Sequence, residues 1–178
     1  DTVAIGYRAM MVAYNGTFTT YNTAVGAYAM YGGGAAATNS GRWNTAVGHS
    51  ALYSMNTGHY NSAFGQSALY ANTTGTNNTA VGLSALYTNV GKQESTAVGY
   101  YAMRYADSTS TGTPSYNPAL GAYALQGPTT AASNTAIYNT AVGHSAMMSS
   151  TTGGYNTAVG VNALTNNSTG TNNVGIGY

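Results

Sequence analysis

Only a few residues in this 178-residue chain carry side chains suited to acid–base or metal chemistry. His49 and His144 follow the same five-residue phrase, Asn-Thr-Ala-Val-Gly, 95 residues apart. General acid–base catalysis and metal binding both need several such groups converging on one point. We therefore expect single solvated histidines, with no metal site, no cofactor and no enzymatic activity. The complete set of candidates is Asp1, Glu94, Asp107, His49, His59 and His144.

Asparagines within Asn-x-Ser/Thr triplets offer a second kind of chemistry, the attachment of N-linked glycans. Such triplets arise by chance in a chain this rich in Asn and Thr. An uncharged surface of Ser, Thr and Asn would nevertheless be made more soluble by N- or O-linked glycans. Glycosylation is therefore a hypothesis that the sequence raises. The candidate sites are Asn15, Asn72, Asn77, Asn166 and Asn167.

The composition excludes several classes of partner. Asp, Glu, Lys and Arg make up 4% of the chain, against about 25% in an average soluble domain. The four basic residues stand singly, so no basic surface follows a nucleic-acid backbone. No apolar run approaches the ~18 residues that a membrane helix needs, so we expect no membrane span. A net charge near zero favours association of the chain with itself.

Glycines recur along the chain at a nearly fixed spacing, and this repeat determines how any functional residues are arranged. A short phrase, most often Asn-Thr-Ala-Val-Gly, closes on a glycine ten times, with steps of 20, 22, 17, 17, 17, 22, 22, 17 and 17 residues. Alanine and then Leu or Met follow the first nine of these glycines at the third and fourth positions. A fixed period of this length indicates a solenoid. The closing glycines are Gly6, Gly26, Gly48, Gly65, Gly82, Gly99, Gly121, Gly143, Gly160 and Gly177.

Each unit has the composition of one β-coil. Thr-Ala-Val-Gly is a short β-branched run, Ala-Leu-Tyr is a second apolar run, and turn residues separate the two. We therefore predict an all-β fold, a parallel β-solenoid (β-roll) of about ten 17- to 22-residue coils, each with two short strands and two turns. The extra residues of the longer coils are expected to form loops, as at 32–37 and 108–115. Pro118 is expected to begin its strand because it lacks a ladder N–H.

Alternation along the strand predicts which side chains lie inside the coil. In Thr45-Ala46-Val47, alanine points to one face while threonine and valine point to the other. Alanine suits a thin, tightly packed interior. A row of exposed valines would then favour a partner, either another chain around an axis or further copies in a bundle.

A second period lies above the first and divides the single domain, residues 1–178, into two super-repeats. A shift of 95 residues aligns "NTAVGHSAL" at 44–52 with "NTAVGHSAM" at 139–147. Five coils therefore form a unit that is used twice, over about 1–94 and 95–178. This pattern indicates either end-to-end assembly of the chain or a duplication within a longer array.

Aromatic residues also recur at two positions, directly before the phrase and directly after the Ala-Leu/Met pair. Stacking of the coils would bring their rings into ladders. The ladders have a structural interpretation, in which the rings stabilise the stack, and a functional one, in which the tyrosines bind sugar rings. The predicted members before the phrase are Tyr21, Trp43, Tyr60, Tyr116, Tyr138 and Tyr155, and those after the pair are Tyr31, Tyr53, Tyr70 and Tyr87.

The repeats resemble those of a known group of surface proteins. The stretch "NTAVGHSALYSMNTGHYNSAFGQSALYANTTGTNNTAVGLSAL" at 44–86 resembles the head repeats of trimeric autotransporter adhesins and, more closely, the Asn-Thr-Ala-Val-Gly-x-x-Ala-Leu repeats of phage tail fibres. The resemblance covers nearly the whole chain. It implies a left-handed parallel β-roll, often trimeric, at a cell or virion surface and used in attachment. Adhesin heads usually have shorter coils with Ser-x-Ala-Ile-Gly phrasing, from which the coils of this chain depart.

Three functions follow as hypotheses. The first is a structural subunit of an extracellular or cell-surface fibre, in which the chain assembles with itself as a head-to-tail polymer or a trimer. The second is an adhesin or tail-fibre segment that binds a receptor glycan through its tyrosines or its longer loops. The third is ice binding by a row of threonines, namely Thr23, Thr45, Thr79 and Thr96, although Ser62 and Pro118 interrupt that row.

Overall fold

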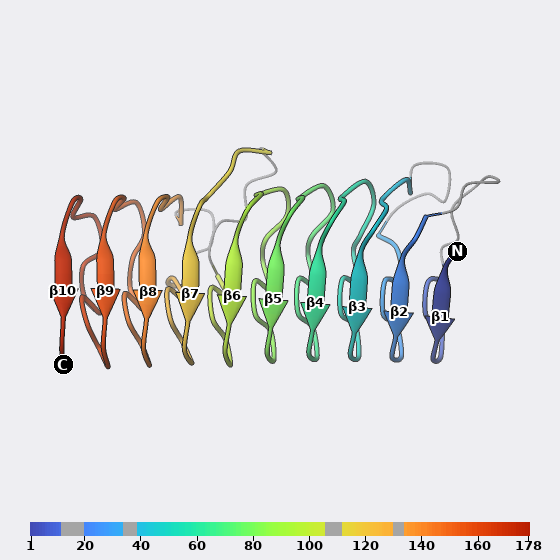
Figure 1. Cartoon of the computed structure of the whole chain (residues 1–178), viewed down its shortest axis with the longest axis horizontal. Helices are drawn as coiled ribbons and strands as arrows, with labels where there is room; N and C mark the ends of the chain where they lie inside the picture. The colour runs from blue at the N-terminus through green and yellow to red at the C-terminus, as the bar shows by residue number, and fades with distance from the viewer. Residues whose placement is uncertain (12–19, 34–38, 106–111, 130–133) are drawn as a thin grey trace.

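A computed structural model of the chain shows ten parallel strands in a single sheet, each hydrogen-bonded to its neighbours in sequence order. The structure describes residues 1–11, 20–33, 39–105, 112–129 and 134–178. Figure 1 shows the strands side by side along a rod, with the two chain ends at opposite ends. The strands are β1 (Val3–Ile5), β2 (Thr23–Val25), β3 (Thr45–Val47), β4 (Ser62–Phe64), β5 (Thr79–Val81), β6 (Thr96–Val98), β7 (Pro118–Leu120), β8 (Thr140–Val142), β9 (Thr157–Val159) and β10 (Val174–Ile176).

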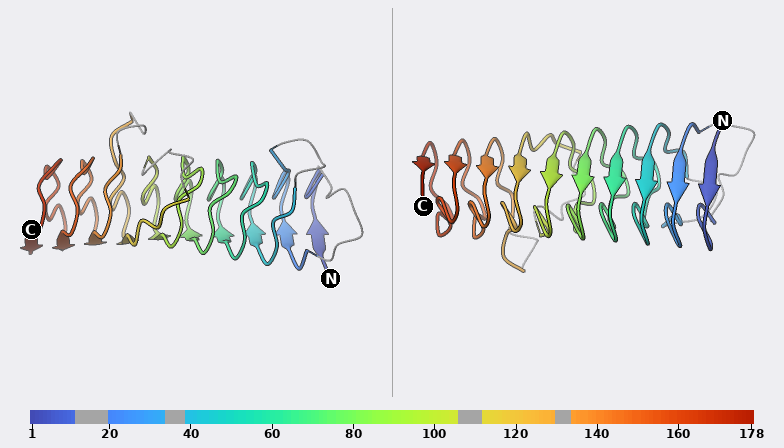
Figure 2. Two further views of the ribbon diagram at one scale, coloured as in Figure 1. Left: turned by 90° about the horizontal axis from the view of Figure 1, so that it is seen from above. Right: turned by 60° about the horizontal axis from the view of Figure 1, so that its bottom comes forward.

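The predicted parallel β-solenoid of about ten coils is thereby confirmed. Equivalent residues of neighbouring phrases pair directly, as Thr45 does with Ser62 and Val47 with Phe64. The sheet forms one side of the rod, and the other segments of each coil lie behind it (Figure 2). Among the described residues, none belongs to a helix with the length and apolarity needed to cross a membrane.

One part of the predicted coil is wrong. The Ala-Leu-Tyr run is a tight turn and not a second strand, so the described residues of each coil contain a single strand. Its Leu or Met residue adopts a left-handed backbone conformation in every such coil, as at Leu69 with φ of 52°. A β-strand requires negative φ, which this residue does not have. Non-glycine residues in this region cost about 1–3 kcal/mol each, which contacts within the stacked coils must offset.

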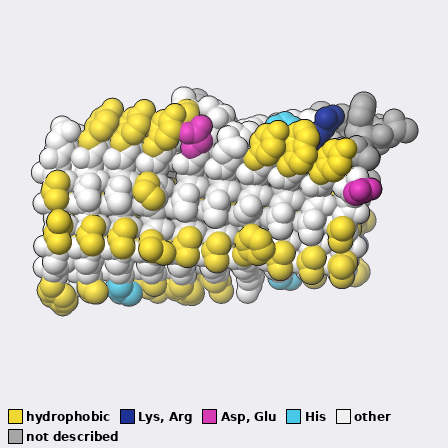
Figure 3. All heavy atoms as spheres, viewed as in Figure 1, with side chains coloured by type: hydrophobic (Ala, Val, Ile, Leu, Met, Phe, Trp, Pro, Cys, Tyr) yellow, Lys and Arg dark blue, Asp and Glu magenta, His cyan; other side chains and the backbone are white. Residues whose placement is uncertain are grey.

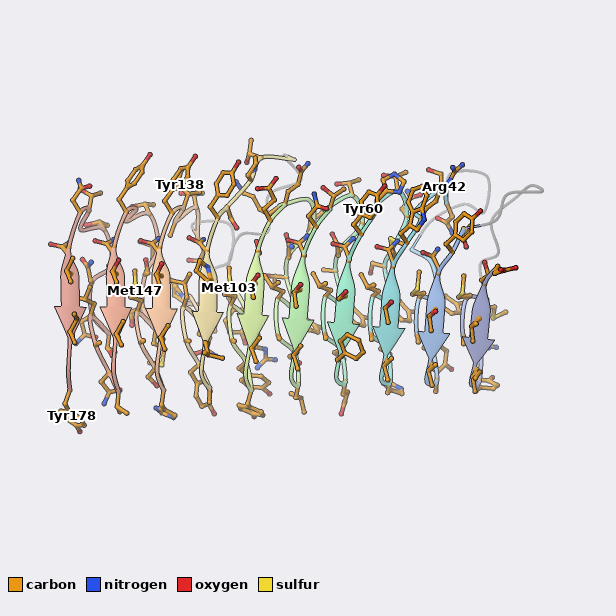
Figure 4. The ribbon with its side chains drawn as sticks, viewed as in Figure 1. Arg42, Tyr60, Met103, Tyr138, Met147 and Tyr178 are labelled. Atoms are coloured by element: carbon orange, nitrogen blue, oxygen red, sulfur yellow. The ribbon has the colours of Figure 1, made fainter. Side chains whose placement is uncertain are left out.

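The interior is built mainly from alanine, as the alternation predicts. The central alanine of β2 to β9 is buried, and the flanking residues are half-buried or exposed. The alanine and the Leu or Met of the turn complete the core from the opposite side, as at Ala68 and Leu69. Met103 and Met147 occupy this interior position in Figure 4.

The outward face of the sheet carries one continuous line of large apolar side chains. We call it the apolar row; it lies beside the column of threonines and is visible as yellow spheres across the middle of the rod (Figure 3). Its members range from half-buried to exposed. The row consists of Ile5, Val25, Val47, Phe64, Val81, Val98, Leu120, Val142, Val159 and Ile176.

A line of buried asparagine side chains connects the coils through the interior. The asparagine that opens a phrase accepts, through Oδ1, a hydrogen bond from the backbone N–H of the residue that opens the next phrase. At five of these junctions it also accepts one from the side-chain amide of the next asparagine. Asn61 Oδ1, for example, lies 3.1 Å from both Asn78 N and Asn78 Nδ2. The Asn61 amide also donates to Asn44 Oδ1 at 3.0 Å and to the Gly75 carbonyl at 2.8 Å. We call this line the Asn ladder; its members are Asn22, Asn44, Asn61 and Asn78, then Asn117, Asn139, Asn156 and Asn173.

The Asn ladder is interrupted at the boundary between the two super-repeats. Ser95 replaces the asparagine, and its hydroxyl pairs with that of Ser115 at 2.5 Å. The same pairing occurs at the first coil, where the Thr2 and Thr20 hydroxyls lie 2.9 Å apart. A cavity of about 10 Å³ borders Ser95 and Ser115, comparable with the roughly 10–15 Å³ that one buried water needs.

The closing glycines stack so closely that no side chain fits between them. Gly65 has φ of 135°, and a Cβ there would lie 2.6 Å from the Gly82 carbonyl oxygen. Gly65→Ala is therefore expected to lower the free energy of unfolding by about 3 kcal/mol or more, because it combines backbone strain with a backbone clash. Urea unfolding measures the change. Gly112→Ala is the matched control, since its Cβ would lie 3.0 Å from the end of the Gln93 side chain and 3.9 Å from the Gly91 carbonyl oxygen, which is an ordinary contact; equal effects of the two variants would contradict the prediction.

Asn61→Ala is expected to lower the free energy of unfolding by about 3 kcal/mol. The substitution leaves the buried N–H of Asn78 without its acceptor, and such an orphaned group costs about 1–3 kcal/mol before the other lost bonds are counted. Asn166→Ala, at an exposed asparagine outside the Asn ladder, is expected to change stability by less than about 0.5 kcal/mol. Thermal or urea unfolding of both variants provides the comparison, and a loss below about 1 kcal/mol at Asn61 would show that the Asn ladder contributes little.

Candidate functional site

Two stacks of exposed aromatic rings form the most conspicuous surface feature of the rod. They lie at what we call the edge position, the residue directly before each phrase. Tyr21, Trp43 and Tyr60 form the first stack, with ring centroids 5.8 and 5.0 Å apart and planes within 3°. Tyr116, Tyr138 and Tyr155 form the second, with centroids 5.0 and 4.9 Å apart. The stacking of these six residues is as predicted.

The six rings do not form one continuous ladder. Asn77 and Glu94 occupy the edge position in the two coils between Tyr60 and Tyr116, and both are exposed. In Figure 3 the two stacks are separate yellow groups along the upper edge, with an acidic side chain beside the left-hand group. Tyr60 and Tyr138, which are labelled in Figure 4, project from this same edge.

The backbone at the edge position is fixed by the coil and not by the side chain. All nine described residues there, from Tyr21 to Asn172, have φ between 51° and 60°. The N–H groups of seven of them donate to the coil before, as Tyr60 does to the Arg42 carbonyl at 3.1 Å and Asn77 to the His59 carbonyl at 3.1 Å. Because the following residue belongs to the Asn ladder or takes its place, each edge side chain is held at the level of its coil.

A further tyrosine ladder follows the Ala-Leu/Met pair, as predicted from the sequence. Tyr31, Tyr53, Tyr70 and Tyr87 stack with centroids 4.9–5.0 Å apart and planes within 12°. These four residues occupy the same position in successive coils, so their stacking follows from the repeat spacing. The Arg104 guanidinium, in the next coil, lies 5.7 Å from the ring centre of Tyr87.

The histidines lie apart, and two of them have equivalent surroundings. His49 contacts the edge of Tyr28 at 5.9 Å, and His144 contacts Tyr123 at 5.6 Å, both at 70° between planes. His59 Nδ1 accepts a hydrogen bond from Arg42 N at 3.0 Å. Burial and then the positive charge of Arg42 lower the pKa of His59 below 6.5. Within the described ranges, no three His, Asp or Glu side chains come close enough to hold a metal ion.

These paired contacts repeat the five-coil period in three dimensions. Tyr7 packs edge-on against Tyr28 with centroids 5.5 Å apart, and Tyr100 packs against Tyr123 at 5.3 Å. Each group therefore continues as a row of three rings, ending in His49 or His144. The two rows differ in their neighbours, since Arg8, Tyr31 and Tyr53 contact Tyr28 in the first row, whereas Tyr101 contacts Tyr123 in the second.

The candidate glycosylation sites have different surroundings. Asn77 and Asn166 are exposed, while Asn167 is half-buried and its Oδ1 accepts a hydrogen bond from Gly170 N at 3.0 Å. The prediction of a glycosylation site at Asn72 is wrong, because this residue is fully buried and its Oδ1 accepts a hydrogen bond from Gly75 N at 2.9 Å. The folded coil leaves no room for a glycan at Asn72. Asn15 lies outside the described residues.

Glu94 changes the acid–base behaviour of the second stack. Its negative charge is the largest influence that raises the pKa of Tyr116 above 10.0, followed by partial burial and the neighbouring Tyr138. The carboxylate disfavours a phenolate beside it. Glu94 and Tyr116 therefore form one polar pair at the end of the second stack.

The fold and its surface define the chain as a parallel β-solenoid with stacked aromatic residues along one edge. Comparisons with protein-family models, curated proteins and solved structures find no match. The resemblance of the repeats to those of tail fibres and adhesins therefore stays a prediction.

Glu94→Gln is expected to lower the pKa of Tyr116 toward 10.0, because the substitution removes the negative charge that opposes ionisation. The difference between the ultraviolet pH titrations of wild type and variant measures the shift. The same substitution in a Tyr116→Phe background is the control, and the titration difference should disappear there. A difference that persists without the Tyr116 hydroxyl would assign the effect to another tyrosine.

Proposed function

We propose that the chain is a structural segment of an extracellular or cell-surface fibre built by stacking of β-solenoid coils. The observation that carries the proposal is the repetition of one set of contacts from β1 to β10. Each coil joins the next through strand pairing and glycine stacking, and along most of the rod the Asn ladder adds to these contacts, as at Asn44, Asn61 and Asn78. Such a stack grows along one axis without changing its cross-section.

The outer edge of β10 matches what a further coil would need. In preceding coils, the first strand residue donates its N–H to the next coil, as Thr157 does to Asn173 O at 2.9 Å. The last strand residue accepts from the next coil, as Val159 O does from Gly177 N at 2.9 Å. Val174 N, Ile176 O and Asn173 Oδ1 stand in these same positions. A following coil, from this chain or another copy, would continue every ladder.

The side surface also supports self-association. The apolar row runs along the whole sheet, beside half-buried hydroxyls, and the chain carries a formal net charge of only +1. Contiguous exposed apolar surface favours contact with another protein surface. Little electrostatic repulsion opposes contact between copies, so rods of this kind would also associate side by side, as a trimer or a bundle.

A second candidate function is an adhesin or tail-fibre segment that binds a receptor glycan. The exposed ring stacks favour it, because aromatic side chains joined to exposed amides suit neutral, ring-shaped ligands. Ice binding is the weakest of the three, because Ser62 and Pro118 interrupt the column of strand threonines beside the apolar row.

Purified chain is expected to form unbranched rods whose length grows with concentration, visible by electron microscopy. Fibre diffraction should show a reflection along the rod axis at about 4.8 Å, the spacing of stacked strands. Val174→Pro removes the N–H that points toward a following coil and is expected to shorten the rods. Proline fits this position, since Pro118 begins β7 and the β7–β8 pairing starts only at Ala119.

Val174→Thr is the matched control for this experiment. It keeps the N–H and introduces the residue that most coils carry at this position. Its rods should equal those of wild type in length. A discrete particle whose size is independent of concentration, in sedimentation as well as microscopy, would contradict the fibre proposal.

A further inference from the structure

The edge position repeats a fixed order of residues in both super-repeats. Three aromatic residues are followed by asparagine, so Tyr60 precedes Asn77 by one coil and Tyr155 precedes Asn172 by one coil. The two pairs are related by the 95-residue shift. The same pair of residues is therefore present twice on the same edge, five coils apart, or about 24 Å at the usual spacing of strands. Their surroundings differ in part, since the centroid of the His59 ring lies 6.2 Å from that of Tyr60, whereas Gly154 precedes Tyr155.

Stacking hides most of the ring faces, but it leaves one face open at the end of each stack. Trp43 covers one face of Tyr60, and Tyr138 covers one face of Tyr155. On the other side of each ring the next edge residue is a shorter asparagine. Tyr60 and Tyr155 are accordingly the most exposed of the six, at 55% and 59%, against 42–50% for the others.

The open ring face and the polar asparagine beside it form what we call a step. The two steps are Tyr60 with Asn77 and Tyr155 with Asn172. Asn77 and Asn172 are exposed and share φ of 57°. Their N–H groups donate to the previous coil at 3.1 Å in both cases, so both backbones are fixed alike. A threonine precedes each one, and Asn172 Nδ2 lies 3.5 Å from Thr171 Oγ1. One coil spacing, about 4.8 Å, is close to the thickness of one stacked ring.

We propose that each step binds one pyranose ring of a neutral glycan. The C–H groups of the sugar would lie on the open face of Tyr60 or Tyr155, because the ring face is electron-rich and apolar. Its edge hydroxyls would exchange hydrogen bonds with the amide of Asn77 or Asn172, which both donates and accepts. Glu94, one coil beyond Asn77, disfavours acidic sugars at the first step.

The proposal gives a ligand class and a place to the glycan-binding candidate, on which it rests, and it is independent of the fibre proposal. Single-ring contacts of this kind are weak, so each step alone should bind in the millimolar range. Two steps on one edge, multiplied along a rod, would give a multivalent surface for a receptor that carries many glycans.

The first experiment locates the ligand by NMR titration of the whole chain, free of glycan by intact mass, with methyl β-D-glucopyranoside. The side-chain amide signals of Asn77 and Asn172 are expected to shift with the glucoside, whereas those of buried Asn44 and Asn139 should not. In the double variant Asn77→Gly/Asn172→Gly, affinity should fall about 3- to 10-fold, the loss of one hydrogen bond per step. Glycine adopts the required positive φ without strain.

The second experiment moves the site. Tyr60→Asn introduces a residue that already occupies the edge position at Asn77, and it opens the face of Trp43, the only tryptophan of the chain. In the wild type, Trp43 lies between Tyr21 and Tyr60, so the glucoside should leave its fluorescence unchanged. In Tyr60→Asn, the glucoside should change it. Tyr138→Asn is the matched control, since it opens a face in the stack that has no tryptophan.

Two results would overturn the proposal. One is the absence of selective shifts at Asn77 and Asn172, and the other is a tryptophan response to the glucoside that is the same in Tyr60→Asn and Tyr138→Asn. Thermal unfolding of each variant shows that the fold is kept. Rod length, measured on the same samples, separates the two proposals: rods without glucoside binding would refute only the glycan step.

Discussion

The hydrogen bonds of the Asn ladder are the interaction on which the rest of the rod depends. One amide serves three coils at once: Asn61 accepts from Asn78, donates to Asn44, and donates to the Gly75 carbonyl. A sheet of three-residue strands has few pairing bonds of its own. Buried amides that are fully hydrogen-bonded add both stability and register to it. These hydrogen bonds fix the position of each coil along the rod axis.

The surface follows from this interior constraint. The edge residue directly precedes the asparagine or its replacement. Its position along the rod axis is therefore set by a neighbour that is buried and hydrogen-bonded to the adjacent coils. Aromatic rings placed there stack at about 5 Å because the coils do, and a shorter residue there leaves a gap one coil high. Tyr60 and Asn77 show both outcomes in consecutive coils. The chain can thus vary its surface, residue by residue, over an unchanged core.

Much of this architecture could be predicted from the sequence, and what could not has physical causes. The number of coils, the inward alanines and the ring stacks all depend on periodicity alone. The Asn ladder was missed because an asparagine beside a strand usually signals a turn, and its buried pairing is evident only once two coils overlap. Leu69 belongs to an apolar run that suggests a strand, yet its conformation is imposed by the turn around it. Asn72 fits a glycosylation triplet, although the local turn buries it.

The orientation of the strands has a mechanical consequence. Because the strands lie across the rod, the hydrogen bonds between coils point along it, and a pull on the two ends loads those bonds in series. The coils would therefore detach one at a time and not all together. Each detached coil would release about 60 Å of extended chain for 17 residues and about 75 Å for 22. A rod of this construction would yield under tension in small, repeated steps and dissipate the load gradually.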